Sequence, residues 1–71
     1  MAIKVNLDRL LEDRSVTIRE LSDAIGITPA NLSVLKNNHA RAIRFSTLES
    51  ICRYLGCQPG ELLNMVEDEE A

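Results

Sequence analysis

The chain has 71 residues, and a domain of this size buries only about 60% of the surface that its unfolded chain exposes. Apolar residues make up 45% of the sequence and only Phe45 and Tyr54 are aromatic, so the core must be small and aliphatic. No apolar run reaches about 18 residues, and the first residues lack the apolar region of a secretory signal. We therefore expect a soluble, cytoplasmic protein with no membrane partner.

Charge is unevenly distributed along the chain. The net charge is -3, but four of the eleven acidic residues lie within positions 67–71, which we expect to form a solvated tail after a domain of residues 1–66. No aspartate or glutamate occurs from residue 24 to residue 48. The cationic and histidine residues of this window are Lys36, His39, Arg41 and Arg44. A locally cationic segment is suited to phosphate binding, because the field near a contact matters more than total charge.

The residues that could support metal binding or catalysis are few. Cys52, Cys57 and His39 provide too few ligands for a zinc site, and two cysteines do not make a disulfide scaffold. We expect reduced thiols in or near the core, and no metal, cofactor or small-molecule ligand. The helix-surface carboxylates have no histidine or serine partner, and no glycine-rich phosphate loop occurs, so we do not expect an enzyme.

The first predicted helix covers residues 7–14. Asn6 is placed to cap it, and leucines at i, i+3 and i+4 spacing form its apolar face. These are Leu7, Leu10 and Leu11. Before this helix, Ile3 and Val5 alternate with polar residues, which is typical of a brief strand. Its expected partner is the segment around Met65 and Val66.

A second and a third helix follow, with a very short turn between them. Thr17 and Glu20 match the T-x-x-E capping box that begins a helix. The apolar positions of this helix are Ile18, Leu21 and Ile25. Gly26 suits the left-handed conformation that ends a helix, and Thr28 with Pro29 can cap and begin the next. Because so few residues separate the two helices, they must cross steeply rather than lie antiparallel.

The third helix, residues 29–36, has an unusual outer face. On a helical wheel Leu32 and Leu35 define the buried direction, and the opposite side carries no charge. Its members are Ala30, Ser33, Val34 and Asn37. An ordinary solvated helix face would carry lysine and glutamate, so this face is suited to contact with another molecule. An isolated exposed aliphatic residue such as Val34 is, however, also common on protein surfaces.

The rest of the chain predicts an exposed loop and two further helices. Ile43 and Phe45 are expected to be buried or half-buried, and Ser46 with Glu49 matches a second capping box. The helix that follows has apolar positions Leu48, Ile51, Cys52 and Leu55, and it ends at Gly56. A last short helix begins at Pro59, with Glu61 in its first turn. It carries Leu62, Leu63 and Met65. Five short helices predict an all-α domain.

The segment IRELSDAIGITPANLSVLKN, residues 18–37, resembles the helix-turn-helix of the Cro and phage-repressor family, also called the Xre family. The matching positions are Leu21, Ser22, Ile25, Gly26, Ile27, Leu32 and Leu35. The segment RFSTLESICRYLGCQPGELL resembles the fourth and fifth helices of the same fold, so the resemblance extends from Asn6 to Val66. It implies a five-helix, lambda-repressor-like DNA-binding domain with the helix-turn-helix formed by helices 2 and 3.

The resemblance also implies which residues contact DNA bases. In the family, the N-terminal residues of the third helix enter the major groove. By position these are Thr28, Pro29, Ala30, Ser33 and Val34. Relatives often carry glutamine or arginine at several of these positions, which form bidentate bonds to purines. Here Pro29, Ala30 and Val34 offer only apolar contact, most naturally to thymine methyl groups.

Phosphate contacts in the family come from the start of helix 2 and from the loop after helix 3. The corresponding residues are Thr17, Arg19, Asn37, Asn38, Arg41 and Arg44. The usual glutamine at the start of helix 2 is replaced by Ile18, which leaves more of the phosphate binding to the two loop arginines. Two alternatives stay open: the asparagines can simply form the left-handed turn after the helix, and the arginines can be solvated loop residues.

The resemblance implies a sequence-specific regulator of transcription that binds double-stranded DNA, namely a repressor acting as a homodimer on a palindromic operator. In relatives the dimer contact lies near the fifth helix, which here places it at Cys57, Gln58, Pro59, Leu62 and Met65. The alternative is a protein-interaction module, antitoxin-like or an adaptor, that keeps the fold without binding DNA. The apolar outer face of the third helix and the net charge of -3 keep this alternative open.

Overall fold

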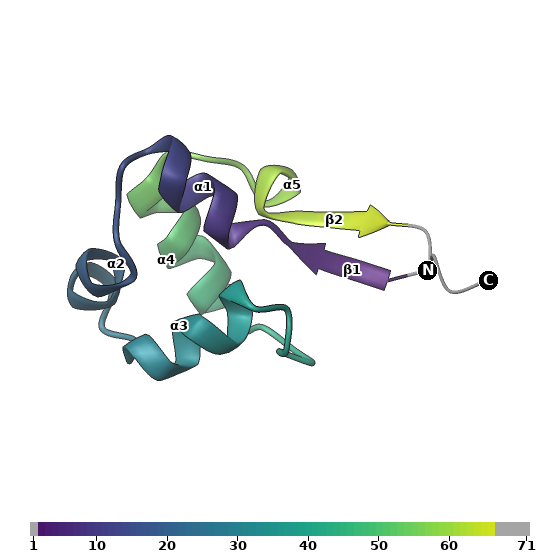
Figure 1. The fold of residues 1–71 in the computed structure, drawn as a ribbon, viewed down its shortest axis with the longest axis horizontal. Coiled ribbons are helices and arrows are strands. Elements are labelled where there is room, and N and C mark those ends of the chain that lie inside the picture. Colours follow the sequence, from purple (N-terminus) through teal and green to yellow (C-terminus); the bar gives the residue numbers. More distant parts are fainter. Residues whose placement is uncertain (1, 67–71) are drawn as a thin grey trace.

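The computed structural model describes residues 2–66 of the chain, which form five helices and a two-stranded antiparallel sheet (Figure 1). In chain order the elements are β1 (Ala2–Val5), α1 (Leu7–Asp13), α2 (Ile18–Ile25), α3 (Pro29–Lys36), α4 (Phe45–Leu55), α5 (Pro59–Leu62) and β2 (Leu63–Val66). The predicted acidic tail, residues 67–71, lies outside the described residues. No helix within residues 2–66 has the length and apolarity needed to cross a membrane.

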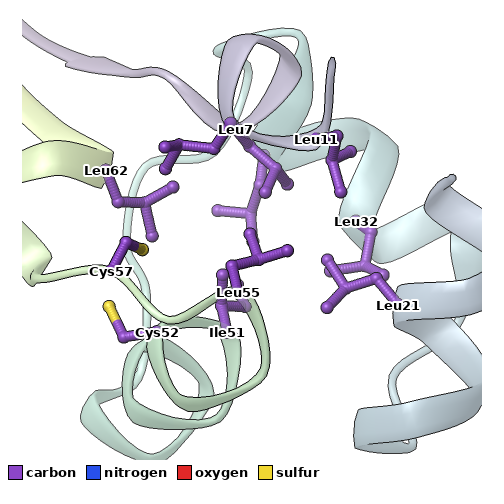
Figure 2. Close-up of a cluster of buried hydrophobic side chains, with 11 residues drawn as sticks. Leu7, Leu11, Leu21, Leu32, Ile51, Cys52, Leu55, Cys57 and Leu62 are labelled. Carbon is purple, nitrogen blue, oxygen red and sulfur yellow. The ribbon is translucent and has the colours of Figure 1, made fainter. Parts of the chain in front are cut away.

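The core is aliphatic, as the composition predicted (Figure 2). Five side chains are completely or almost completely buried, and each of the five helices contributes one of them. They are Leu7, Leu21, Leu32, Ile51 and Leu62. Burial of such a side chain contributes roughly 1.5–3 kcal/mol. Every helix is therefore anchored in one common cluster, although α5 is only four residues long.

The sheet corrects the predicted all-α class and confirms the predicted strand pairing. Ile3 lies opposite Met65 and Val5 lies opposite Leu63. Val5 and Leu63 pack against the core, whereas Ile3 and Met65 are 58% and 59% exposed. Figure 1 shows the two strands side by side, extending away from the helices. The last helix therefore ends at Leu62, earlier than predicted, because the alternating residues that follow it pair with β1.

The predicted caps of α2 and α3 are confirmed. The hydroxyl oxygen of Thr17 accepts a hydrogen bond from the backbone N–H of Glu20 at 3.1 Å, and the Glu20 carboxylate accepts one from the backbone N–H of Thr17 at 2.9 Å. Thr28 accepts from the backbone N–H of Asn31 at 3.2 Å, and Pro29 occupies the first helical position. These bonds satisfy backbone donors that a helix start otherwise leaves unpaired.

The sequence predicted that Asn6 caps α1, but its side chain makes no cap bond. Asn6 instead links the start of α1 to the C-terminal part of the described chain. Its side-chain amide donates to the side-chain oxygen of Asn64. Its backbone N–H donates to the carbonyl of Leu62 at 2.8 Å. Asn64 in turn donates to the carbonyl of Gly60 at 3.0 Å. These bonds hold the start of α1 against α5 and β2.

The start of α4 differs from the prediction in two ways. The helix begins at Phe45, after Arg44 at the cap position, so Ser46 lies inside the helix and caps nothing. Glu49 pairs instead with Arg53, one turn further on, at 2.8 Å. Phe45, expected to be at least half-buried, is 86% exposed. The earlier helix start explains the exposure, because it places Phe45 in the first turn, beyond the core.

Candidate nucleic-acid interface

The turn between α2 and α3 is fixed by local hydrogen bonds. Gly26 adopts the left-handed conformation with φ 74°, and its N–H donates to the Ser22 carbonyl at 2.9 Å. The hydroxyl of Ser22, which is buried, donates to the carbonyl of Ile27 at 2.5 Å. The sequence match required only a small residue at Ser22 and did not predict this bond. The start of α3 is thereby held in a defined direction relative to α2.

The five predicted base-contacting residues are at the surface, at the start of α3 and along its outer side. Leu32 and Leu35 are buried, at 0% and 7% exposure, as the helical wheel predicted. Thr28, Pro29 and Ala30 are exposed, Ser33 is half-buried and Val34 is 43% exposed. The surface they form carries no charged side chain.

Val34 is not an isolated surface residue. It borders an open groove between α3 and the start of α4, together with Ala40, Ile43 and Thr47. Its carbonyl accepts a hydrogen bond from the backbone N–H of His39 at 2.9 Å. The loop after α3 is thus bonded to the backbone of α3 at Val34, and the Val34 residue stays 43% exposed.

Three arginines lie in the segments predicted to contact phosphate. Arg19 is exposed on α2, and Arg41 and Arg44 are exposed between α3 and α4. None of the three forms an ion pair with a carboxylate in residues 2–66. Lys36, in contrast, lies 3.8 Å from a carboxylate oxygen of Asp8. The arginine charges are therefore not neutralised within the described part of the chain.

Asn38 forms the left-handed turn after α3 and also contacts β1. Its φ is 62°, whereas Asn37, which ends α3, has φ -91°. The side-chain oxygen of Asn38 accepts from the backbone N–H of Val5 at 2.6 Å, and its amide nitrogen lies 3.4 Å from the Val5 carbonyl oxygen. The side chain thus bonds to the outer edge of β1 as a neighbouring strand would. No sequence pattern predicted this link.

Thr17, the remaining predicted phosphate contact, is exposed at the start of α2. Its hydroxyl oxygen already accepts the cap bond described above, so its hydroxyl hydrogen is what it can still donate.

The residues predicted for a dimer contact fall into three places. Cys57 and Gln58 lie on the turn between α4 and α5, Pro59 begins α5, and all three border one groove, although Cys57 is only 7% exposed. Met65 is exposed on β2. Leu62 is 0% exposed, which corrects its assignment to a contact surface, because its side chain is part of the core.

The two cysteines are free and buried, as predicted. Gly56 ends α4 with φ 67°, and the N–H of Cys57 donates to the Cys52 carbonyl at 3.0 Å. This backbone pattern places the two side chains in contact, and their sulfur atoms lie close together in Figure 2. Burial, and then the neighbouring Cys52 thiol, raise the pKa of Cys57 to about 11. Within residues 2–66, no three metal-binding side chains come together.

Residues 6–68 match the family of Cro/C1-type HTH DNA-binding domains, and the chain belongs to this family. Among its relatives is the uncharacterized HTH-type transcriptional regulator YozG of Bacillus subtilis (strain 168), which is 54% identical over 70 residues, or 99% of this chain and 83% of that protein. The crystal structure of the transcriptional regulator VanUg, Form II, is similar with a TM-score of 0.74 and 28% identity, over 93% of this chain and 87% of that one. The predicted family resemblance is thereby confirmed.

Proposed function

We propose that the protein regulates transcription by sequence-specific binding to double-stranded DNA, with α2 and α3 as its helix-turn-helix and α3 in the major groove. The observation that carries this proposal is the uncharged, exposed face of α3 beside three arginines that no described carboxylate neutralises. The family to which the chain belongs supports the same function. The negative net charge does not oppose it, because phosphates respond to the local field.

Base recognition in this proposal relies mainly on apolar contact. Pro29, Ala30 and Val34 offer carbon atoms to thymine methyl groups, while Thr28 and Ser33 each offer a hydroxyl group. None of these side chains can form the bidentate bonds to purines that distinguish bases most strongly. We therefore expect a preference for thymine at a few positions, supplemented by DNA shape.

Phosphate contacts would provide most of the affinity and set the position of the protein on the duplex. We assign them to Thr17, Arg19, Asn37, Asn38, Arg41 and Arg44. Among these residues, Asn38 is the least available for a phosphate contact, because both polar atoms of its side chain already bond to Val5.

We further propose that the protein acts as a homodimer on a palindromic operator, with the two α3 helices about 34 Å apart. A single module of this kind buries roughly 600–1,000 Å² on DNA, which supports only modest affinity. Two modules on adjacent half-sites would raise the affinity for DNA. The expected outcome of binding is repression, because an occupied operator excludes other proteins from the same DNA.

A second candidate function is a protein-interaction module that does not bind DNA. The exposed apolar surface formed by Ala30 and Val34 favours it, since this surface fits a protein as well as a thymine methyl group.

Selection of bound duplexes from a random pool at fixed salt tests the two candidates. The DNA-binding proposal predicts enrichment of a palindrome, and an affinity whose logarithm falls with the logarithm of salt concentration by about 0.9 per phosphate contact. Val34→Ala should change the selected bases at one or two positions, mainly where thymine occurs. Lack of enrichment, together with binding too weak to show a salt slope, would favour the interaction module.

A further inference from the structure

Cys52 and Cys57 are the only cysteines of the chain, and the fold brings them together. Cys52 lies in the last turn of α4, and Cys57 follows the left-handed Gly56 that ends this helix. The bond from the Cys57 N–H to the Cys52 carbonyl, at 3.0 Å, holds the two backbones together, and the two sulfur atoms lie close together in Figure 2. A single buried cysteine is an ordinary core residue, but two neighbouring thiols form a pair of ligands.

The pair lies where the core meets the solvent. An open groove of about 540 Å³ runs along α4 and the α4–α5 turn, and Cys52, Gly56 and Cys57 all border it. A β-carbon added at Gly56 would meet no atom within 4 Å, so this part of the groove is open. Cys52 is 9% exposed and Cys57 is 7% exposed. An ion can therefore reach the two thiols from the groove.

The number and type of the ligands select the kind of ion. Within residues 2–66, no group of three or more histidine, cysteine, aspartate or glutamate side chains could hold a metal ion. Structural zinc sites use four ligands, and calcium and magnesium require several oxygen atoms. Cu(I) is a soft ion that thiolates select. Two thiolates in a linear arrangement complete its coordination, so a pair of cysteines fits this ion.

We propose that Cys52 and Cys57 bind one Cu(I) ion between their sulfur atoms, at the groove along α4 and the α4–α5 turn. On binding, two S–H bonds break, two Cu–S bonds form and two protons pass to the solvent, because thiolates are the ligands. Copper keeps its oxidation state. Neither cysteine is assigned a DNA contact, so this binding site is a function beyond the proposed regulation of transcription.

The charges around Cys57 bear on the same site. Burial and the Cys52 thiol raise the pKa of Cys57, Glu61 raises it further, and Arg14 lowers it. A buried thiolate is unfavourable unless a cation neutralises it, and Cu(I) supplies that cation. The complex of one Cu(I) ion with two thiolates carries one negative charge. Arg14 should therefore stabilise the complex, and Glu61 should oppose it.

Transfer of Cu(I) from its bicinchoninate complex, measured under argon, tests the site. The wild-type chain should take up one Cu(I) ion per chain and gain the ultraviolet absorption of a Cu(I) thiolate. Cys52→Ala and Cys57→Ala should each leave the copper on bicinchoninate. Met65→Leu is the matched control, because Met65 is an exposed residue with a soft thioether, and its uptake should equal that of wild type. Equal uptake by the cysteine variants would overturn the proposal.

Urea unfolding with and without Cu(I) tests whether the folded chain forms the site, because the unfolded chain also carries both thiols. Cu(I) should raise the urea midpoint of wild type and leave that of Cys57→Ala unchanged, since a ligand of the folded state stabilises it. Circular dichroism checks that the variants fold, and Cys57→Ser, which keeps the side-chain size, serves if Cys57→Ala does not. A midpoint that falls with Cu(I) would show that the ion prefers the unfolded chain, which would overturn the proposal.

Charge variants test the position of the ion. Glu61→Gln should tighten Cu(I) binding severalfold, and its amide oxygen can still accept the bond from the Gln58 N–H. Arg14→Gln should weaken Cu(I) binding severalfold. These opposite shifts are specific to an anionic complex beside Cys57, because loss of a merely structural side chain gives no reason for tighter binding. No change in either variant would place the ion elsewhere and contradict the proposal.

Three other outcomes would also contradict the proposal. The first is uptake of one ion by two chains, which would place the copper between molecules. The second is a loss of free thiols after the copper is removed with a chelator, which would show that the cysteines had been oxidised. The third is displacement of Cu(I) by an equal concentration of Zn(II), because a site with two ligands should not hold zinc well.

Discussion

At the scale of single residues, Arg44 shows how a protein of negative net charge can present a cation to DNA. It lies in the part of the sequence that lacks carboxylates, and no described carboxylate pairs with it. Its side chain makes no cap bond at the start of α4, so it has no evident structural task. Its charge is therefore available to a phosphate.

Arg44→Ala should weaken binding to all duplexes by a similar factor, because a phosphate contact carries no sequence information. The salt slope of the affinity should become shallower by about one unit, which a titration of binding against salt concentration measures. Arg9→Ala provides the control, since Arg9 is an exposed arginine on α1 and lies outside the segments assigned to phosphate contact. An unchanged slope for Arg44→Ala would remove Arg44 from the interface.

At the scale of elements, α3 is tied to the rest of the fold at both ends. The Ser22 hydroxyl fixes the turn before it, and the Asn38 side chain binds the loop after it to Val5 in β1. The sheet is therefore linked to the helix that we place in the major groove. Isolated two-stranded sheets have marginal stability, so this link also supports the strands.

Asn38→Gly should destabilise the fold by about 1 kcal/mol, because it removes the side-chain bonds to Val5 while glycine tolerates the left-handed conformation. Asn38→Ala should lower the free energy of unfolding by about 1 kcal/mol more than Asn38→Gly does, because alanine is strained in the left-handed conformation. Urea denaturation measures both values, and hydrogen exchange of the Val5 amide should become faster. Asn37→Gly is the control, since it leaves the Val5 bonds intact. If Val5 exchanges equally slowly in Asn38→Gly, the link does not protect β1.

The elements also show what the sequence could and could not predict. Thr17 and Glu20 were predicted correctly because a capping box involves only neighbouring residues. Ser46 and Glu49 match the same pattern, but α4 starts at Phe45 and Glu49 pairs with Arg53. When two helix starts compete within one turn, the local pattern does not decide between them. The exposure of Phe45 was missed for this reason.

The candidate site also has features that the sequence predicted and one that it did not. Helical spacing predicted the buried Leu32 and the exposed Val34, because periodicity fixes which side of a helix faces the core. The bond between Asn38 and Val5 joins residues 33 positions apart, and neither residue type signals it. Contacts of this range depend on the assembled fold.

At the scale of the whole molecule, one small core must hold five helices and the base of a sheet. The long axis is 40 Å and the other two are 21 Å, and the sheet extends away from the helices (Figure 1). Cys52 and Cys57 belong to the core and also border the open groove along α4 and the α4–α5 turn. A change at these thiols therefore affects global stability and not only one turn.

The pKa of Cys57 makes this stability depend on pH in the alkaline range. Burial and the adjacent Cys52 thiol raise that pKa from 9.0 to about 11 in the folded protein. The unfolded chain releases the proton near pH 9, whereas the folded protein retains it, so alkaline pH favours unfolding. The stability that the protonated Cys57 thiol contributes is fully present below about pH 9 and is lost as the pH rises to about 11. A pKa difference of this size corresponds to about 2–3 kcal/mol in the free energy of unfolding.

Urea unfolding under reducing conditions at several pH values between 7.5 and 11 measures this loss. The difference between wild type and Cys57→Ala isolates the contribution of this thiol. The variant should be less stable near neutral pH, because a core side chain is truncated, and it should lose less stability as the pH rises. Parallel pH profiles for the two proteins would show that the Cys57 thiol ionises equally easily in the folded and unfolded chains, and that the core does not keep it protonated.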